Sequence, residues 1–173
     1  MSDSIATLLL ENIQPRPGRG SWHGGPTAVG ALRGVSAEQA AWTPAPGRKN
    51  IWQLTLHIAY WKYAVRRRIE GGADSRFPRV PANWPRLPTP ADERAWRQDV
   101  ALLKHEHARL VEVIAAVPPS RYGVEVPEGK RWTIGEMILG IAQHDAYHTG
   151  QIQLLKRLWA SLADARPDDN IRS

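Results

Sequence analysis

The sequence predicts an all-α protein, a four-helix bundle with short extra helices near its N-terminus. Three observations support this class: apolar residues recur at helical spacing, helix-start motifs precede these stripes, and no segment makes a persuasive strand. A chain of 173 residues has the size of one domain, so we assign residues 1–173 to a single helical bundle. Residues 163–173 are polar, and we expect them to fray from the last helix.

Short elements separated by proline and glycine make up the N-terminal part. Residues 4–14 carry apolar side chains at helical spacing and predict a short amphipathic helix. Residues 15–25 form a loop rich in helix-breaking residues. Residues 26–32 predict a short helix that Gly34 can terminate, and the motif from Ser36 to Gln39 predicts one or two further turns.

Three long helices are predicted in the rest of the chain. The first starts at the motif from Asn50 to Gln53 and runs to about residue 70. After a long loop at residues 71–89, the second starts with Pro90 at its first helical position and runs to about residue 117. The last starts with a capping box at residues 133–136 and continues to about residue 162.

The composition excludes several classes of protein. The chain has no cysteine, which rules out disulfide scaffolds, thiolate zinc fingers, iron–sulfur centres and a cysteine nucleophile. Any metal ion must therefore be held by nitrogen and oxygen atoms. No apolar stretch approaches a membrane span, and the N-terminus lacks the basic region of a signal peptide. We expect a cytoplasmic protein that does not bind a membrane, because a chain without cysteine suits a reducing compartment.

The formal net charge is +6, which permits an acidic partner such as nucleic acid. The basic residues are nevertheless scattered, and no nucleic-acid-binding motif accompanies them. Their densest group, residues 66–68, ends a predicted helix, where cations complement the helix dipole without any ligand. We therefore do not expect nucleic acid to be a partner.

Two histidines interrupt the apolar stripe of the last predicted helix. His144 and His148 are four residues apart, so their rings lie on one face and can converge on one metal ion. The alternative is two core histidines, each hydrogen-bonded to its own polar partner. His57, near the middle of a wide apolar arc on the helix of residues 50–70, supplies a third ligand. Three neutral imidazoles leave a coordination position open, which is typical of a catalytic metal site.

Three further residues are candidates to hydrogen-bond the predicted ligands. Asp145 either orients an imidazole or acts as a general base, the alternative being an acid on the helix surface. Gln151 follows on the side of His144. His107 lies in the apolar seam of the preceding helix, and we assign it as a hydrogen-bonded core histidine rather than a fourth ligand. The remaining catalytic and cofactor-binding residues stay unassigned.

The helix of residues 50–70 also bears on oligomeric state. Its narrow polar side is expected to carry Thr55, Lys62 and Arg66. A second apolar strip on this helix consists of Trp52, Leu56, Tyr60 and Tyr63. This strip exceeds what one small core needs, so it either forms the interface of a homodimer or is covered by the N-terminal segments.

Two segments resemble the DinB superfamily. They are LTLHIAYW, which contains His57, and HDAYHTGQI at residues 144–152; the motifs at residues 22–26 and 132–136 support them. The resemblance covers nearly the whole chain. It implies a bundle of DinB-like type, commonly a homodimer, with a divalent metal ion bound by three histidines that correspond to His57, His144 and His148.

Together these observations predict a metal-dependent enzyme that acts on a small molecule. The resemblance implies a thiol-dependent transferase or a hydrolase. We expect zinc or nickel as the ion bound by the neutral imidazoles, and a low-molecular-weight thiol is a candidate co-substrate. Because the chain has no cysteine, the sulfur in any thiol chemistry must come from such a molecule. The alternative is a non-catalytic, metal-stabilised bundle that serves in binding or stress response. A nucleic-acid-binding protein is a weaker alternative.

Overall fold

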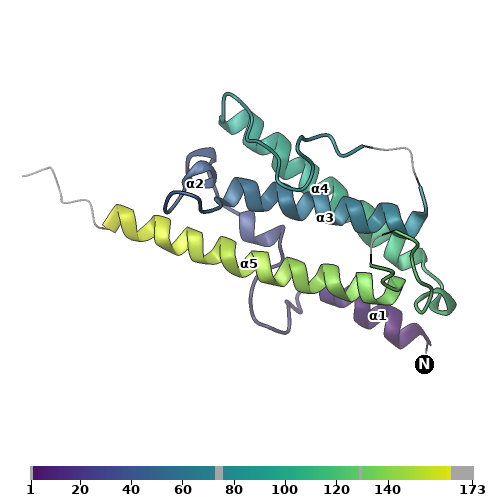
Figure 1. Ribbon diagram of the computed structural model, residues 1–173. Coiled ribbons are helices and arrows are strands. Elements are labelled where there is room, and N and C mark those ends of the chain that lie inside the picture. The colour runs from purple at the N-terminus through teal and green to yellow at the C-terminus, as the bar shows by residue number, and fades with distance from the viewer. Residues whose placement is uncertain (1, 73–75, 129, 165–173) are drawn as a thin grey trace, which may run out of the picture.

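The computed structural model describes residues 2–72, 76–128 and 130–164, and these are mostly helical (Figure 1). Within these ranges the α-helices are α1 (Ser2–Ile13), α2 (Ala37–Ala41), α3 (Ile51–Glu70), α4 (Glu93–Ala116) and α5 (Ile134–Asp164). Short 3-10 helices lie at Gly30–Leu32 and Pro119–Arg121. The described residues contain no strand, only an isolated bridge between Glu125 and Thr133, so the all-α prediction is confirmed. None of the described helices is both long and apolar enough to cross a bilayer.

Four helices form the bundle. α3 packs against α4 and α5, and α1 closes the ring because it packs against the same two helices. In Figure 1, α3 and α4 run in one direction, whereas α1 and α5 run in the other. A parallel pair of consecutive helices needs a long crossover, which is the connection from Gly71 to Asp92. The predicted four-helix bundle is confirmed, with α1 as its fourth helix.

The predicted capping motifs start three of the helices. The Asn50 side chain accepts a hydrogen bond from the Gln53 backbone N–H at 2.8 Å, and the Gln53 side chain accepts one from the Asn50 N–H. Thr133 and Glu136 make the same reciprocal pair at the start of α5. Ser36 accepts from the N–H of Gln39 at the start of α2. Each side chain satisfies a backbone donor that has no partner within its helix.

Two predicted boundaries are wrong. Pro90 is not the first helical residue, because Asp92 is the N-cap of α4 and accepts from the Ala95 N–H at 2.8 Å. The helix predicted at residues 26–32 is only a 3-10 turn, in which the Thr27 hydroxyl accepts from the Gly30 N–H. Of the tail expected to fray at residues 163–173, residues 165–173 lie outside the described part of the chain.

The core consists of two apolar clusters with a polar layer between them. One cluster surrounds Trp52, Leu103 and Ile152, and the other surrounds Leu110 and Ile138. Between the clusters, α3, α4 and α5 all present polar side chains. We call these residues the polar layer: Lys62, Arg66, Glu106, His107, His144, Asp145 and His148.

The predicted polar side of α3 is buried rather than exposed to solvent. Thr55 and Lys62 are both 0% exposed, because α3 has a neighbouring helix on each side. The Lys62 ammonium forms an ion pair with Asp145 of α5. The Arg66 guanidinium lies 3.2 Å from a carboxylate oxygen of Glu106 on α4. These two ion pairs connect three helices across the polar layer.

The second apolar strip of α3 is covered within the same chain. Trp52 and Leu56 are fully buried, and Tyr63 is nearly so. The Trp52 indole donates a 2.8 Å hydrogen bond to Asp99 of α4. Tyr60 is partly buried and its ring packs on Phe77 of the connection between α3 and α4, so the strip is not a free apolar surface. A homodimer stays a prediction, without the support that the strip was expected to give.

Replacing Lys62 by methionine leaves the Asp145 carboxylate buried without its partner. We expect the free energy of unfolding to fall by about 3–5 kcal/mol, and the double variant Lys62→Met, Asp145→Leu to recover most of this loss. Urea denaturation of the metal-free protein measures both effects. Lys104→Met at an exposed position of α4 is the control and should change stability by less than about 0.5 kcal/mol. A Lys62→Met variant as stable as the parent would contradict this account.

Candidate metal centre

Three histidines meet between α3 and α5. His57 comes from α3, whereas His144 and His148 lie one turn apart on α5. One ring nitrogen from each lies within 4.8 Å of the others. Among the described residues, no other group of three potential metal-binding side chains is arranged in this way. The structure thus brings together the three histidines that the sequence singled out.

Hydrogen bonds fix the tautomers of two of these rings. His57 Nδ1 donates to the backbone carbonyl of Asn83 at 2.8 Å, and His148 Nδ1 donates to the side-chain oxygen of Gln151 at 2.6 Å. Both partners are oxygens that can only accept, so the proton of each neutral ring lies on Nδ1. The Nε2 lone pairs are therefore available to a ligand, as in metal sites where the outer nitrogen of a histidine is hydrogen-bonded.

The third ring completes the arrangement without such a partner. His144 Nε2 lies 3.2 Å from His57 Nε2. Its Nδ1 is buried and has no hydrogen-bond partner among the described residues. The position of this ring therefore depends on packing and on what its Nε2 atom faces.

The spacing of the nitrogens suits a metal ion. Two imidazole nitrogens bound to one zinc ion at about 2.0–2.1 Å lie roughly 2.8–3.4 Å apart, for angles between octahedral and tetrahedral values. The 3.2 Å between the Nε2 atoms of His57 and His144 falls in this interval. Imidazole is also a donor that zinc and nickel both accept. These residues therefore fit a divalent ion of this kind.

Burial keeps the three rings neutral. It lowers the pKa of His57 and of His148, and it is the largest of the effects that lower the pKa of His144 to about 3. Repulsion from the two other histidines and from Lys62 lowers the pKa of His144 further. A neutral imidazole is the form that binds a metal ion, so the site is prepared for one at neutral pH.

Aromatic rings enclose the centre. The Trp84 ring stacks on the His57 ring with 3.7 Å between centroids and 6° between planes. The Lys49 ammonium lies 4.7 Å from the centroid of Trp84, on the ring face. The ring centroids of Trp61 and His144 are 6.0 Å apart. His57 is thus held by the backbone carbonyl of Asn83 and by the ring of Trp84, the next residue after Asn83.

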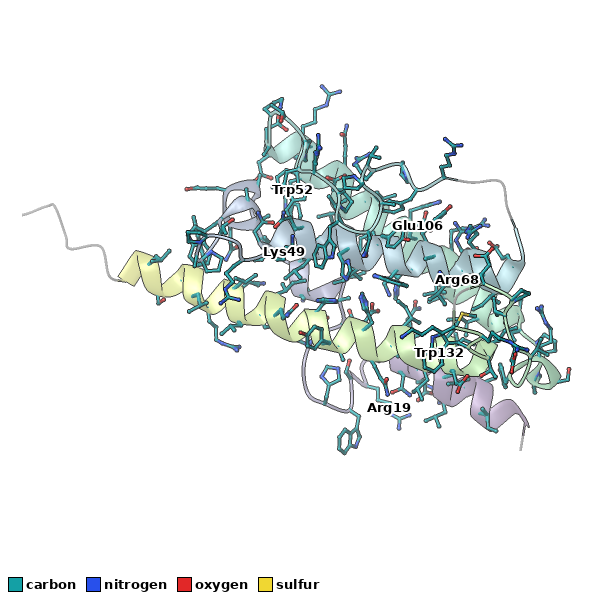
Figure 2. The ribbon with its side chains drawn as sticks, viewed as in Figure 1. Arg19, Lys49, Trp52, Arg68, Glu106 and Trp132 are labelled. Carbon is teal, nitrogen blue, oxygen red and sulfur yellow. The ribbon has the colours of Figure 1, made fainter. Side chains whose placement is uncertain are left out.

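A cavity of about 720 Å³ borders His144. Arg68 and Trp132, both labelled in Figure 2, line it from α3 and from the segment that precedes α5. Trp61 and Met137 add apolar surface, and Glu128 is among the charged residues. The cavity gives a small molecule room to approach one side of the histidine cluster.

The structure bears differently on the three residues that were predicted to lie next to the clustered histidines. Asp145 is buried and pairs with Lys62, so it is not an acid of the helix surface, and its one hydrogen bond within the described residues does not go to a histidine. Gln151 does hydrogen-bond one of the three clustered histidines, but this is His148 rather than His144. His107 lies outside the cluster, and its buried Nδ1 has no partner among the described residues. It is therefore a core histidine, but not a hydrogen-bonded one at that nitrogen.

Sequence reasoning missed three residues around the site: Asn83, Trp84 and Lys62. The first two belong to the crossover loop, where a tryptophan among prolines is a signal that the loop packs onto the bundle. Lys62 lies between Trp61 and Tyr63 on a helix that is apolar over a wide arc. Such an isolated lysine indicates a buried acidic partner, although the helix pattern alone does not identify that partner as Asp145.

Comparison with known families settles the relationship that the histidines suggested. The sequence model of the DinB superfamily matches residues 26–152, which is more than half of the chain and includes all three histidines. The chain belongs to the DinB superfamily. This DinB match does not extend to α1 or to the loop at residues 15–25. No curated protein and no solved structure matches the chain.

The stability of the metal-free protein should depend on His107 in acid. Burial, with a smaller effect of Lys62, lowers the pKa of His107 from 6.5 to about 4, so the unfolded chain takes up this proton first as the pH falls. The stability that His107 contributes is complete above pH 6.5 and is lost as the pH falls from 6.5 towards 4. Between about pH 7.5 and about pH 5, this loss is about 1–2 kcal/mol.

Urea denaturation at these two pH values checks the expectation. The variant His107→Leu should lose about 1–2 kcal/mol less on acidification than the parent protein. The matched control is His105→Leu, two residues away and exposed, which should behave as the parent does. Equal acid sensitivity of the two variants would show that His107 does not titrate as its burial implies.

Proposed function

We propose that this DinB-superfamily protein is a metal-dependent enzyme that binds zinc or nickel through His57, His144 and His148. We further propose that it acts on a small molecule by thiol-dependent transfer or by hydrolysis. One observation carries the proposal: three neutral imidazoles converge, and hydrogen bonds from Nδ1 leave Nε2 of His57 and His148 available. Zinc sites that have three protein ligands keep a position for water or substrate.

The bound ion would act as a Lewis acid, which lowers the pKa of a water or thiol that binds to it. The three histidine ligands are neutral, so they leave the positive charge of the ion uncompensated. Lys62 and Asp145 compensate each other beside the site. An anionic group such as a thiolate or hydroxide is therefore favoured in the open position.

The surrounding residues have separate roles in this proposal. The Asn83 carbonyl and the Gln151 side chain orient His57 and His148. Trp84 excludes water from one face of His57, because it stacks flat against that ring. Trp61 and Trp132 would contact an apolar part of the substrate, and Arg68 would bind an acidic group on it, since all three line the cavity beside His144.

Metal analysis tests the ligand set directly. The protein, purified without an affinity tag and loaded with zinc or nickel, should retain about one ion per chain after dialysis. The double variant His144→Ala, His148→Ala should retain almost none, because it keeps a single ligand. The variant His105→Ala removes an exposed histidine from α4 and should retain the ion. Equal metal content in the double variant and the parent would refute the site.

Thiol binding tests the proposed chemistry separately. In cobalt-substituted protein, a thiolate bound to the ion produces a sulfur-to-cobalt charge-transfer band, which we expect when low-molecular-weight thiols are added. The variant Trp132→Ala should bind metal normally but bind the thiol substrate or its acceptor more weakly. If the ion raises the melting temperature but no thiol binds and neither transfer nor hydrolysis is detected, the protein is instead a non-catalytic, metal-stabilised bundle.

A further inference from the structure

A second, smaller cavity lies on the α1 side of α5. Its volume is about 200 Å³, and its walls come from α1, from the loop before the 3-10 helix Gly30–Leu32, and from α5. Figure 1 shows this loop passing below α5, whereas α3 lies above α5 in the same view. None of the three clustered histidines lines this cavity.

Two buried side chains on the wall of this cavity lack hydrogen-bond partners. Asp145 and Thr149 lie one turn apart on α5 and are only 7% and 3% exposed. Neither Asp145 Oδ1 nor Thr149 Oγ has a hydrogen-bond partner within the described part of the chain. Both residues line the cavity, and buried polar atoms in proteins almost always have a partner, so an unpaired acceptor and an unpaired hydroxyl on this wall point to a bound polar molecule.

The other polar groups of the cavity add both donors and acceptors. The Asn12 amide nitrogen donates to the Leu8 carbonyl at 2.8 Å, which leaves its amide oxygen as an acceptor. His23 Nδ1 accepts from the Gly25 N–H, so in the neutral ring the proton lies on Nε2, which can donate. The lining therefore offers both donors and acceptors.

Charge narrows the class of ligand. Asp145 is the one formally charged residue of the lining, and Lys62 already compensates its charge through the other carboxylate oxygen. A cationic ligand would place a second positive charge beside this ion pair, whereas an anionic ligand would face the carboxylate. A hydroxyl group suits the site better, because it can donate to Asp145 Oδ1 and also accept from Thr149.

The volume of the cavity limits the class of ligand further. Cavities of roughly 150 Å³ can take up a ring of six carbon atoms, so a cavity of about 200 Å³ has room for a molecule of this size. We propose that this cavity is a binding site for a small neutral polyol, with Asp145 Oδ1 and Thr149 Oγ as its principal hydrogen-bonding partners. The site shares no lining residue with the three-histidine cluster, and Asn12, Ser21 and His23 of its lining lie outside the segment that matches the DinB superfamily.

Binding of erythritol to the full-length protein tests the proposal. Isothermal titration calorimetry and amide chemical-shift changes should detect binding, with a Kd on the order of 1 mM for a ligand with so few atoms. Thr149→Val removes the hydroxyl at nearly constant volume and should weaken binding about tenfold, the effect of losing one hydrogen bond. The matched control Thr55→Val makes the same change in α3, where the hydroxyl bonds the Ile51 carbonyl, and should bind as the parent does.

Two further variants and a second ligand complete the experiment. Asn12→Ala changes the α1 wall and repeats the test if Thr149→Val does not fold. His57→Ala removes a metal ligand and should leave erythritol binding unchanged, which separates this site from the proposed metal centre. Absence of erythritol binding would mean a water-filled cavity only, and would overturn the proposal. Binding that is insensitive to Thr149→Val and Asn12→Ala, or binding of 1,4-diaminobutane in place of erythritol, would overturn it as well.

Discussion

The need to satisfy charged groups inside the bundle governs the rest of this structure. α3 is enclosed by α4 and α5, so its residues Lys62 and Arg66 are buried and pair with carboxylates on those neighbours. An unpaired charge in such a place costs far more than a missing apolar contact. The relative position of the three helices is thus fixed by polar partners as well as by the apolar clusters on either side. Two of the three clustered histidines, His144 and His148, belong to the polar layer and share that constraint.

The parallel course of α3 and α4 has a direct effect on the site. Two consecutive helices that run the same way need a connection that returns along the bundle, and here the returning chain passes over His57. That connection supplies the carbonyl of Asn83 and the ring of Trp84. A short turn could have supplied neither. The topology therefore accounts for the residues that orient one histidine and cover it from solvent.

Local patterns in the sequence were enough to predict the long helices, because the caps of α3 and α5 are formed by residues three apart in the chain. The same helical periodicity brought His144 and His148 to one face. It could not predict the surroundings of α3, since whether Lys62 faces solvent depends on which helices flank it. Trp84 was missed for a similar reason: a loop residue has no periodicity, and its contact with His57 exists only in the folded chain.

The distances along the chain have a consequence for assembly. Lys62 and Asp145 are 83 residues apart in sequence, and His57 and His144 are 87 residues apart. Neither pair can form before α3 and α5 dock, so a chain that has formed only its separate helices has no three-histidine site. An ion held by these histidines would act as a reversible cross-link that closes a very long loop, the role that a disulfide has in other small proteins. In this chain without cysteine, metal binding and the stability of the folded state would be linked.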